Sequence, residues 1–309
     1  MIRRLAQVAC KIEQIEGSPE TLANSDAGIT VYDPKFDVNV NSYKRDPARA
    51  SMSNLARIQG GANVCKLTFK ADLRTSGSVA VAPDIGILLK ACGFTEAVVA
   101  QTSVTYTPAS LAIPSYTMAL YMDGTVKKMT GARGTVKFVH KLGEPVQCEF
   151  EFTGILVAVT DLGLLTTVSY SSETPPKFQG TAILTMGSYS AILTALTIDI
   201  ANKIAVRENA NKASGAISAY IVSREPKGSY DPEFALVGTH DFYGKMIAGT
   251  PMAFSEVLGS GAGHIITVTM PVVQYTEISD ADRNGIAVAQ AGFAVSGSAG
   301  DDELSIAMT

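Results

Sequence analysis

The sequence of 309 residues has no tryptophan and only three histidines, His140, His240 and His264, which lie far apart. The missing tryptophan counts against a carbohydrate-binding surface, because such surfaces depend on large aromatic side chains. The isolated histidines have no metal-ligand spacing, and no Gly-x-Ser-x-Gly motif provides a nucleophile for one of them. The sequence therefore predicts no enzyme, no metal site and no cofactor.

Charge is also scarce, since only 17% of the residues are charged, against about a quarter in ordinary soluble domains. The formal net charge of −4 is too small to predict a face that binds nucleic acid, which would need clustered Lys and Arg. The low charge indicates that much of the surface is neutral or covered by partners.

The four cysteines form no Cys-x-x-Cys pair, and we expect buried free thiols at Cys10, Cys65, Cys92 and Cys148. The opening residues, MIRRLAQVACKIEQIEG, lack the apolar region of a signal peptide, and without it QVAC is not a lipoprotein site. No apolar stretch approaches the roughly 18 residues of a membrane helix. We expect a protein that is used or assembled in the cytoplasm, without a membrane partner.

The abundant residues, Gly, Ser, Thr, Val and Ala, favour strands and turns, so the predicted class is mainly β. Residues 62–77, ANVCKLTFKADLRTSG, alternate between apolar and polar side chains, as a strand with one wet face does. Residues 146–153 alternate in the same way. The polar positions of these two strands are Lys66, Lys70, Asp72, Arg74, Gln147, Glu149 and Glu151.

Two β-rich regions are separated by the polar, proline-containing residues 171–177, which predict domains over 1–172 and 178–309. The strand pattern FDVNVNSYKRD at 36–46 matches IDIANKIAVREN at 198–209, and the strand at 62–77 matches residues 214–229. The interpretation is an internal duplication of one β-rich unit.

Each half also contains one predicted helix and several hairpins. In the first half, PDIGILLKACGF has helical spacing and ends at Gly93; in the second, residues 231–246 predict a helix with Asp231 as N-cap. Hairpin turns are predicted at Asp123-Gly124, at Leu142-Gly143 and at Asn284-Gly285. The last of these explains DADRNG at 280–285 better than a calcium loop, because Ala291 stands where a bidentate Glu is required.

The order of LTFKADLRTSGS, APDIGILLKACGF, YTMALYMDGTVKKMTGARGTVKF and EFEFTG, followed by SGAISAYIVSREPKGSYDPE, DRNGIAVAQAGFAVSG and DDELSIAMT, resembles the major tail tube proteins of long-tailed bacteriophages. The resemblance spans most of the chain. It implies two tandem antiparallel β-sandwich or near-barrel domains, each with one flanking helix. It also implies a virion protein of the tail, assembled in the host cytoplasm, whose rings stack into a tube for the genome.

With two such domains, three copies could close a pseudo-hexameric ring, although a hexamer of larger protomers stays open. The implied partners are further copies of the chain, the tape measure, tail terminator and tail-tip proteins, and genomic DNA that passes without specific binding. The alternative function is a two-domain β-sandwich binding module, such as a tail-tip or host-surface recognition protein.

Two sets of residues are candidates for assembly. The first two strands are linked by a long polar segment, residues 42–61, whereas RENANKAS suffices in the second half. The resemblance implies that this loop reaches the next ring through Lys44, Arg45, Arg49 and Arg57, and the alternative is a mobile loop with solvated charge. The polar strand positions given above are candidates for the lumen or its rim, but the sequence leaves open which polar face lines it.

Overall fold

Regular structure in this protein is almost entirely β-strand, as a computed structural model of residues 2–180 and 183–309 shows. The predicted mainly β class is confirmed. Two α-helices and one short 3-10 helix complete the regular elements of the described chain, and each half contains one of the α-helices. Neither α-helix exceeds six residues, so neither has the length of a membrane-spanning helix.

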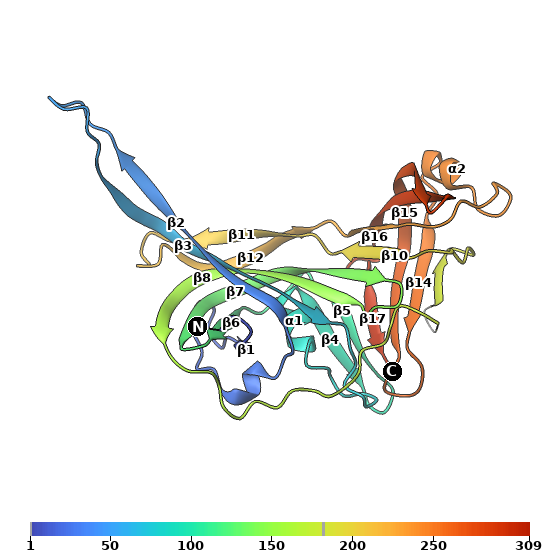
Figure 1. The fold of residues 1–309 in the computed structure, drawn as a ribbon, viewed down its shortest axis with the longest axis horizontal. Helices are drawn as coiled ribbons and strands as arrows, with labels where there is room; N and C mark the ends of the chain where they lie inside the picture. The colour runs from blue at the N-terminus through green and yellow to red at the C-terminus, as the bar shows by residue number, and fades with distance from the viewer. Residues whose placement is uncertain (1, 181–182) are drawn as a thin grey trace.

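The first half contributes eight strands and two helical segments (Figure 1). These elements are β1 (Ala6–Ile12), η1 (Asn24–Ala27), β2 (Tyr32–Arg45), β3 (Leu55–Asp72), α1 (Gly86–Ala91), β4 (Phe94–Val99), β5 (Ser103–Pro108), β6 (Tyr116–Met122), β7 (Thr125–Lys141) and β8 (Gln147–Asp161). The elements of the second half are β9 (Ile183–Met186), β10 (Ala195–Asp199), β11 (Asn202–Glu208), β12 (Ala216–Arg224), β13 (Lys227–Tyr230), α2 (Phe242–Ile247), β14 (Met252–Leu258), β15 (Ile266–Arg283), β16 (Ile286–Ser296) and β17 (Ser305–Met308).

The strands of the two halves pair in the same order. In the first half the neighbours are β1, β6, β7, β8, β3 and β2; in the second they are β9, β14, β15, β16, β13 and β10. All of these pairs are antiparallel. The β4–β5 hairpin and β17 have no counterpart in the other half.

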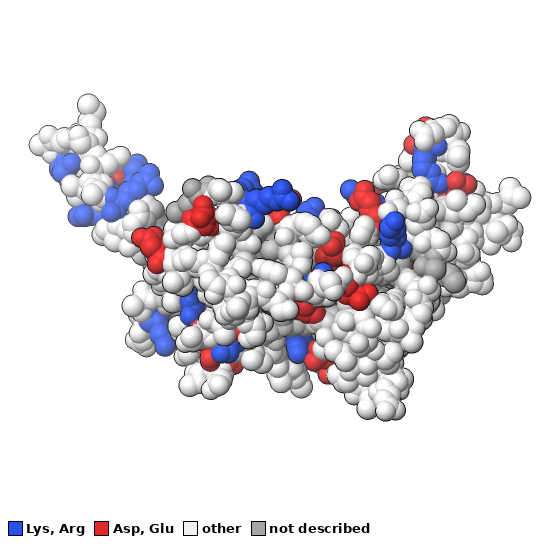
Figure 2. All heavy atoms as spheres, turned by 60° about the horizontal axis from the view of Figure 1, so that its bottom comes forward, with Lys and Arg blue, Asp and Glu red and all other residues white. Residues whose placement is uncertain are grey.

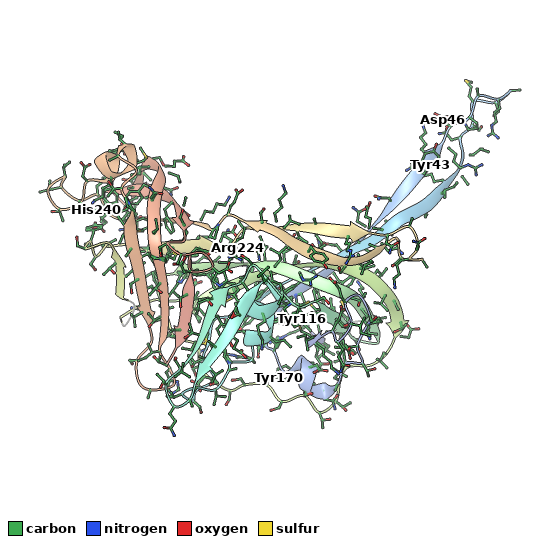
Figure 3. All side chains as sticks on the ribbon, turned by 180° about the vertical axis from the view of Figure 1, so that it is seen from behind. Tyr43, Asp46, Tyr116, Tyr170, Arg224 and His240 are labelled. Atoms are coloured by element: carbon green, nitrogen blue, oxygen red, sulfur yellow. The ribbon has the colours of Figure 1, made fainter. Side chains whose placement is uncertain are left out.

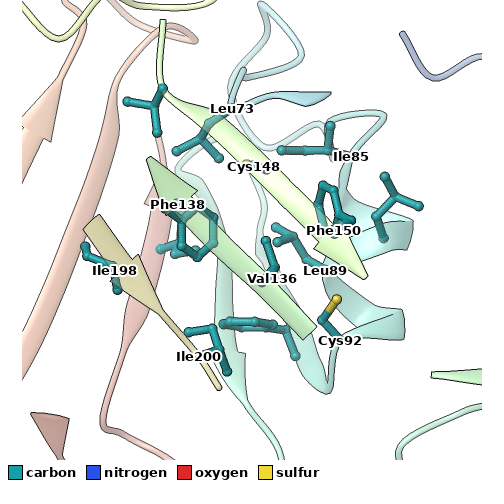
Figure 4. Packing of buried hydrophobic residues seen from close by; sticks show 14 of the residues in the cluster. Leu73, Ile85, Leu89, Cys92, Val136, Phe138, Cys148, Phe150, Ile198 and Ile200 are labelled. Atoms are coloured by element: carbon teal, nitrogen blue, oxygen red, sulfur yellow. The ribbon is translucent and has the colours of Figure 1, made fainter. Parts of the chain in front are cut away.

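The two halves share one sheet and one core. Strand β7 pairs with β10, and β17 pairs with β15 on one side and β5 on the other, so 15 strands are connected. One cluster of buried side chains runs from Val8 to Met308. Figure 4 shows part of it, where Val136 and Phe150 of the sheet lie near Leu89 of α1 and Ile198 lies beside Phe138. The alternation of apolar residues therefore directs one face of the sheet into a common interior.

The three predicted hairpin turns are confirmed. Asn284 and Gly285 both have positive φ, 55° and 85°, as a two-residue turn between twisted strands requires. The Asp282 carboxylate accepts hydrogen bonds from the Gly285 N–H. DADRNG is thus a hairpin end.

The first predicted helix is confirmed as α1, which buries Leu88 and Leu89 and is followed by Gly93 at φ 85°. The second was predicted with the wrong start. Its N-cap is Asp241, whose carboxylate accepts the Gly244 N–H at 2.7 Å. Asp231 instead accepts backbone N–H groups of Thr194 and Ala195, which fixes the start of β10. An Asp before a proline is suited to accept backbone N–H groups in a turn as well as at the start of a helix.

All four cysteines are free and buried, as predicted. Burial raises the pKa of the Cys65 thiol to about 12 and raises that of Cys92 well above its usual value. Since the thiolate is the reactive form, these side chains act as small apolar residues.

Candidate assembly surfaces

The most prominent surface feature is a hairpin that projects from the body of the molecule, built from the distal ends of β2 and β3 (Figure 1). We call residues 41–61 the arm. Every residue of the arm except Leu55 is exposed. The expected long loop is therefore mostly strand, and only residues 46–54 lie outside β2 and β3. The ladder continues outward as far as the pair Arg45 and Leu55.

The arm carries four basic residues, Lys44, Arg45, Arg49 and Arg57, and one acidic residue, Asp46. Figure 2 shows the Lys and Arg side chains gathered there, and Figure 3 shows Tyr43 and Asp46 far from the body. Their contacts are local, such as Arg49 to the Ser53 carbonyl at 2.7 Å. Exposed pairs of this kind stabilise little. The side chains of Tyr43 and Met52 are 71% and 105% exposed. The arm is thus basic and partly apolar, and it projects free of the rest of the described chain beyond its base, where Gly61 lies against Gly215.

The corresponding hairpin of the second half, β11–β12, lies against the first half instead of projecting. Asn202 Nδ2 donates to the carbonyls of Cys92 and Gly134, at 2.7 and 2.9 Å. The arm and the β11–β12 hairpin occupy equivalent positions in the two halves. They nevertheless differ in environment, because the arm projects from the body and β11–β12 lies against it.

A buried polar contact fixes this hairpin at its middle. The Arg133 guanidinium donates to the Ala219 carbonyl at 2.5 Å and pairs with Glu16 at 3.0 Å, and it lies 4.6 Å from the centre of the Tyr220 ring. Ser218 and Tyr220 also donate to the Glu16 carboxylate. Partial burial opposes the charge of Glu16, but the hydrogen bonds from Ser218, Arg133 and Tyr220 outweigh it and lower the pKa of Glu16.

The predicted polar face of β3 and β8 is present. Lys66 pairs with Glu151 at 2.5 Å and Lys70 pairs with Glu149 at 2.7 Å, while Asp72 accepts the Tyr32 hydroxyl. The hydrogen bond to Glu149 raises the pKa of Lys70. Gln147 lies opposite Asp72 in the ladder. The structure thus brings six of the seven polar positions together on one face, where their charges largely neutralise one another.

The seventh, Arg74, does not lie on that face. Its side chain is 6% exposed and binds the Asp84 carboxylate through two nitrogens. Strand β3 ends at Asp72, so the alternation no longer decides the direction of Arg74. The buried pair instead fixes the segment that leads into α1. The expectation of a solvent-facing Arg74 is thereby corrected.

Arg224 lies in the segment 214–229, which the sequence pattern matches with residues 62–77, but its role differs from that of Arg74. Arg224 is the last residue of β12 and binds Asp301, Glu303 and the Ala109 carbonyl (Figure 3). Hydrogen bonds from Ser110 and Arg224 lower the pKa of Asp301 despite partial desolvation. Arg224 therefore ties the segment before β17 to the first half. The C-terminal residues form β17 and pair within the chain.

The histidines are not brought together. His140 lies 3.1 Å from the buried Glu256 carboxylate, His240 contacts the Tyr275 hydroxyl at 2.9 Å, and His264 contacts Glu173 at 2.8 Å. Burial lowers the pKa of His240 to about 4. Within residues 2–180 and 183–309, no three His, Cys, Asp or Glu side chains are placed to hold a metal ion.

Sequence reasoning missed the contacts that join the halves, above all those of Arg133 with the Ala219 carbonyl and of Arg224 with the Ala109 carbonyl. The sequence did contain one signal of a buried polar contact: Arg133 lies among small residues in GARG, at a strand position that would otherwise be apolar. Its partners Glu16 and Ala219 are 117 and 86 residues away in the sequence, separations that no local pattern encodes.

A continuous antiparallel sheet, a projecting hairpin and a neutralised polar face define a structural assembly protein. A scan against protein families matches the phage tail tube protein family over residues 4–301. The chain therefore belongs to that family, and it is a structural protein of the virion tail. No curated protein matches it.

Proposed function

We propose that three copies of this chain form a ring of six similar β units, and that the rings stack into a tube whose channel conducts the genome. The units are residues 1–172 and 178–309, joined through the linker at 171–177. The observation that carries this proposal is the repeated strand order, since two units with one order can occupy equivalent places around an axis.

The sheet itself supports closure into a ring. Eight strands follow one another without interruption in the order β2, β3, β8, β7, β10, β13, β16, β15. Closure of a sheet removes its edge strands, which otherwise invite uncontrolled pairing. Three such sets of strands would form one continuous barrel wall.

The polar face of β3 and β8 is proposed to line the lumen or its rim. Lys66, Lys70, Glu149 and Glu151 pair with one another on this face. DNA would meet few unpaired cations there, and attraction between Lys or Arg and phosphate is what would slow its passage. Asp72 and Gln147 belong to the same face.

The arm is proposed to contact the next ring, through Lys44, Arg45, Arg49 and Arg57 together with its exposed apolar residues. An arm without support from its own chain is ordered best by a neighbour. In the tail, the tape measure protein would occupy the lumen during assembly, and terminator and tip proteins would cover the ends of the tube.

Electron microscopy of the purified protein in negative stain tests this function. We expect rings or tubes with a central hole, whose averaged end-on views have threefold symmetry with six similar lobes. Dispersed single chains that bind a host surface would contradict the proposal and favour a recognition module. Rings of six chains would contradict the trimer.

A further inference from the structure

The contact between the two halves of one chain can be transferred to the contact between two chains, because the strands of both halves can be aligned position by position. Across the first half, ladder partners run from Phe36 through Leu67 and Phe152 to Gly134; across the second, they run from Ile198 through Gly228 and Phe293 to Tyr275. The four residues of each half therefore lie in one row across four neighbouring strands, and we align the two rows residue by residue.

An independent pair of strands gives the same alignment. Two residues before Gly134 is Ala132, which lies opposite the first residue of β6, Tyr116. Two residues before Tyr275 is Val273, which lies opposite the first residue of β14, Met252. The rows thus agree on both sides of β7 and β15.

Within the chain, the seam between the halves is the pairing of β7 with β10, in which Lys141 to Lys137 lie opposite Ala195 to Asp199. By the alignment, residues 197–199 correspond to residues 35–37 of β2. Residues 137–141 correspond to residues 279–283 of β15, because Lys137 lies opposite Glu149 and Ser279 opposite Gln290, each three residues before the aligned phenylalanine.

Both of these corresponding segments are open at the edge in question. β2 pairs with β3 alone and ends the sheet. The pairing of β14 with β15 stops at Val273, and in the described chain residues 276–282 have backbone partners only in β16. Helix α2 contacts this part of β15 through side chains, as in the hydrogen bond from the Tyr243 hydroxyl to Asp280.

The backbone groups also face the required way. Arg283 and Ile286 flank the two-residue turn and are opposite each other, so their backbones bond across the hairpin. Alternation then directs the backbone N–H and C=O of Asp280 and Asp282 to the free edge. Asp280 corresponds to Phe138, which faces Ile198 in the seam.

We infer that residues 35–37 of β2 in one copy pair antiparallel with residues 279–281 of β15 in the next copy, in the register of the internal seam. Lys35 then lies opposite Ala281 and Asp37 opposite Ser279, and the regular ladder ends at the bulge between Tyr32 and Lys35, where Asp33 has a positive φ of 48°. No like charges are directly opposite, which would destabilise the pair. The inference rests on the proposed ring.

Cysteine cross-linking of assembled protein tests the register. Phe36 and Asp280 form the hydrogen-bonded pair, so Lys35 and Ala281 form the non-hydrogen-bonded pair beside it, with Cα atoms close enough for a disulfide. The double variant Lys35→Cys with Ala281→Cys should give, after oxidation, covalent species that stop at three chains. The native cysteines are buried and add little background.

Two matched variants control this experiment. Thr197→Cys with Val139→Cys places the same pair at the internal seam and should give a bridge within one chain. Lys35→Cys with Asp282→Cys shifts the register by one residue, which directs the thiols to opposite faces, and it should give no more cross-linking than either single variant.

The outcomes separate the register from the ring. Rings in electron micrographs without the Lys35→Cys, Ala281→Cys bridge, or with an equal bridge in the shifted variant, would overturn the register and leave the ring standing. Cross-linked ladders beyond three chains would place the contact between rings and also overturn it. Absence of rings altogether would overturn the proposed function.

Discussion

A single guanidinium, that of Arg133, connects three segments that are distant in sequence. It donates to the Ile113 carbonyl, the Ala219 carbonyl and the Glu16 carboxylate, and it is almost fully buried. Without the arginine each of these acceptors would lose one hydrogen bond, and Glu16 would keep only those from Ser218 and Tyr220. Buried charge pairs gain little over apolar residues but are costly to break on one side.

We therefore predict that Arg133→Ala lowers the free energy of unfolding by about 3–5 kcal/mol. Urea denaturation followed by circular dichroism would measure the loss. The control is Arg207→Ala, since Arg207 is 57% exposed and 3.9 Å from Glu16; we expect a change below about 0.5 kcal/mol there. Equal effects of the two variants would show that the buried hydrogen bonds of Arg133 do not hold the hairpin.

At the level of residues, the sequence predicts burial well wherever alternation continues through a strand. Cys65 and Cys148 are buried as their phase predicts, and Lys66 and Glu151 are on the wet side. Arg74 fails because it lies two positions beyond the end of β3, where its direction depends on Asp84. Such a partner is set by tertiary packing, which one strand cannot reveal.

At the level of elements, hairpins could be predicted from turn residues, but the environment of each hairpin could not. The same strand order gives a docked hairpin at β11–β12 and a free one at the arm, because only the first finds the surface around Arg133 within its own chain. The start of α2 could not be predicted from the local sequence, since Asp231 and Asp241 are both suitable N-caps. Asp231 instead binds the backbone at the start of β10, and Asp241 caps the helix.

We predict that deletion of residues 46–58 leaves the body folded but shortens or abolishes stacked tubes, because the deleted residues contact only one another and their own hairpin. Circular dichroism would check the fold, and tube lengths in electron micrographs would check stacking. Replacement of Lys44, Arg45, Arg49 and Arg57 by serine keeps the reach of the arm and removes its charge, so it separates the two contributions. Tube lengths equal to those of the native protein after the deletion would reject a stacking role.

At the scale of the whole molecule, the two halves are bound by a common core and by backbone pairing at two places, β7 with β10 and β17 with β5. The repeat of the first strand could be recognised in the sequence, but the match of residues 62–77 with 214–229 was out of register, because the ladders make Leu67 equivalent to Gly228 and not to Ala219. The pairing of strands across the halves could not be predicted from the sequence, because the residues of an edge strand do not indicate which other strand it will pair with. The resemblance supplied the family, and the strand order supplies the argument for equivalent units.

We predict that the isolated chain unfolds in one cooperative transition, since residues of both halves line the same interior. Calorimetry and fluorescence of the tyrosines should give coincident midpoints, and a fragment of residues 178–309 alone should fail to fold. Two separated transitions would mean that the halves are independent domains in the sense of separate cores.

The arm belongs to one half only. If three copies form the proposed ring, this asymmetry would limit how successive rings are rotated: six identical units would accept the next ring in any of six orientations, whereas three arms would restrict the equivalent orientations to three. The proposed tube would then have threefold helical symmetry although its wall approximates sixfold symmetry.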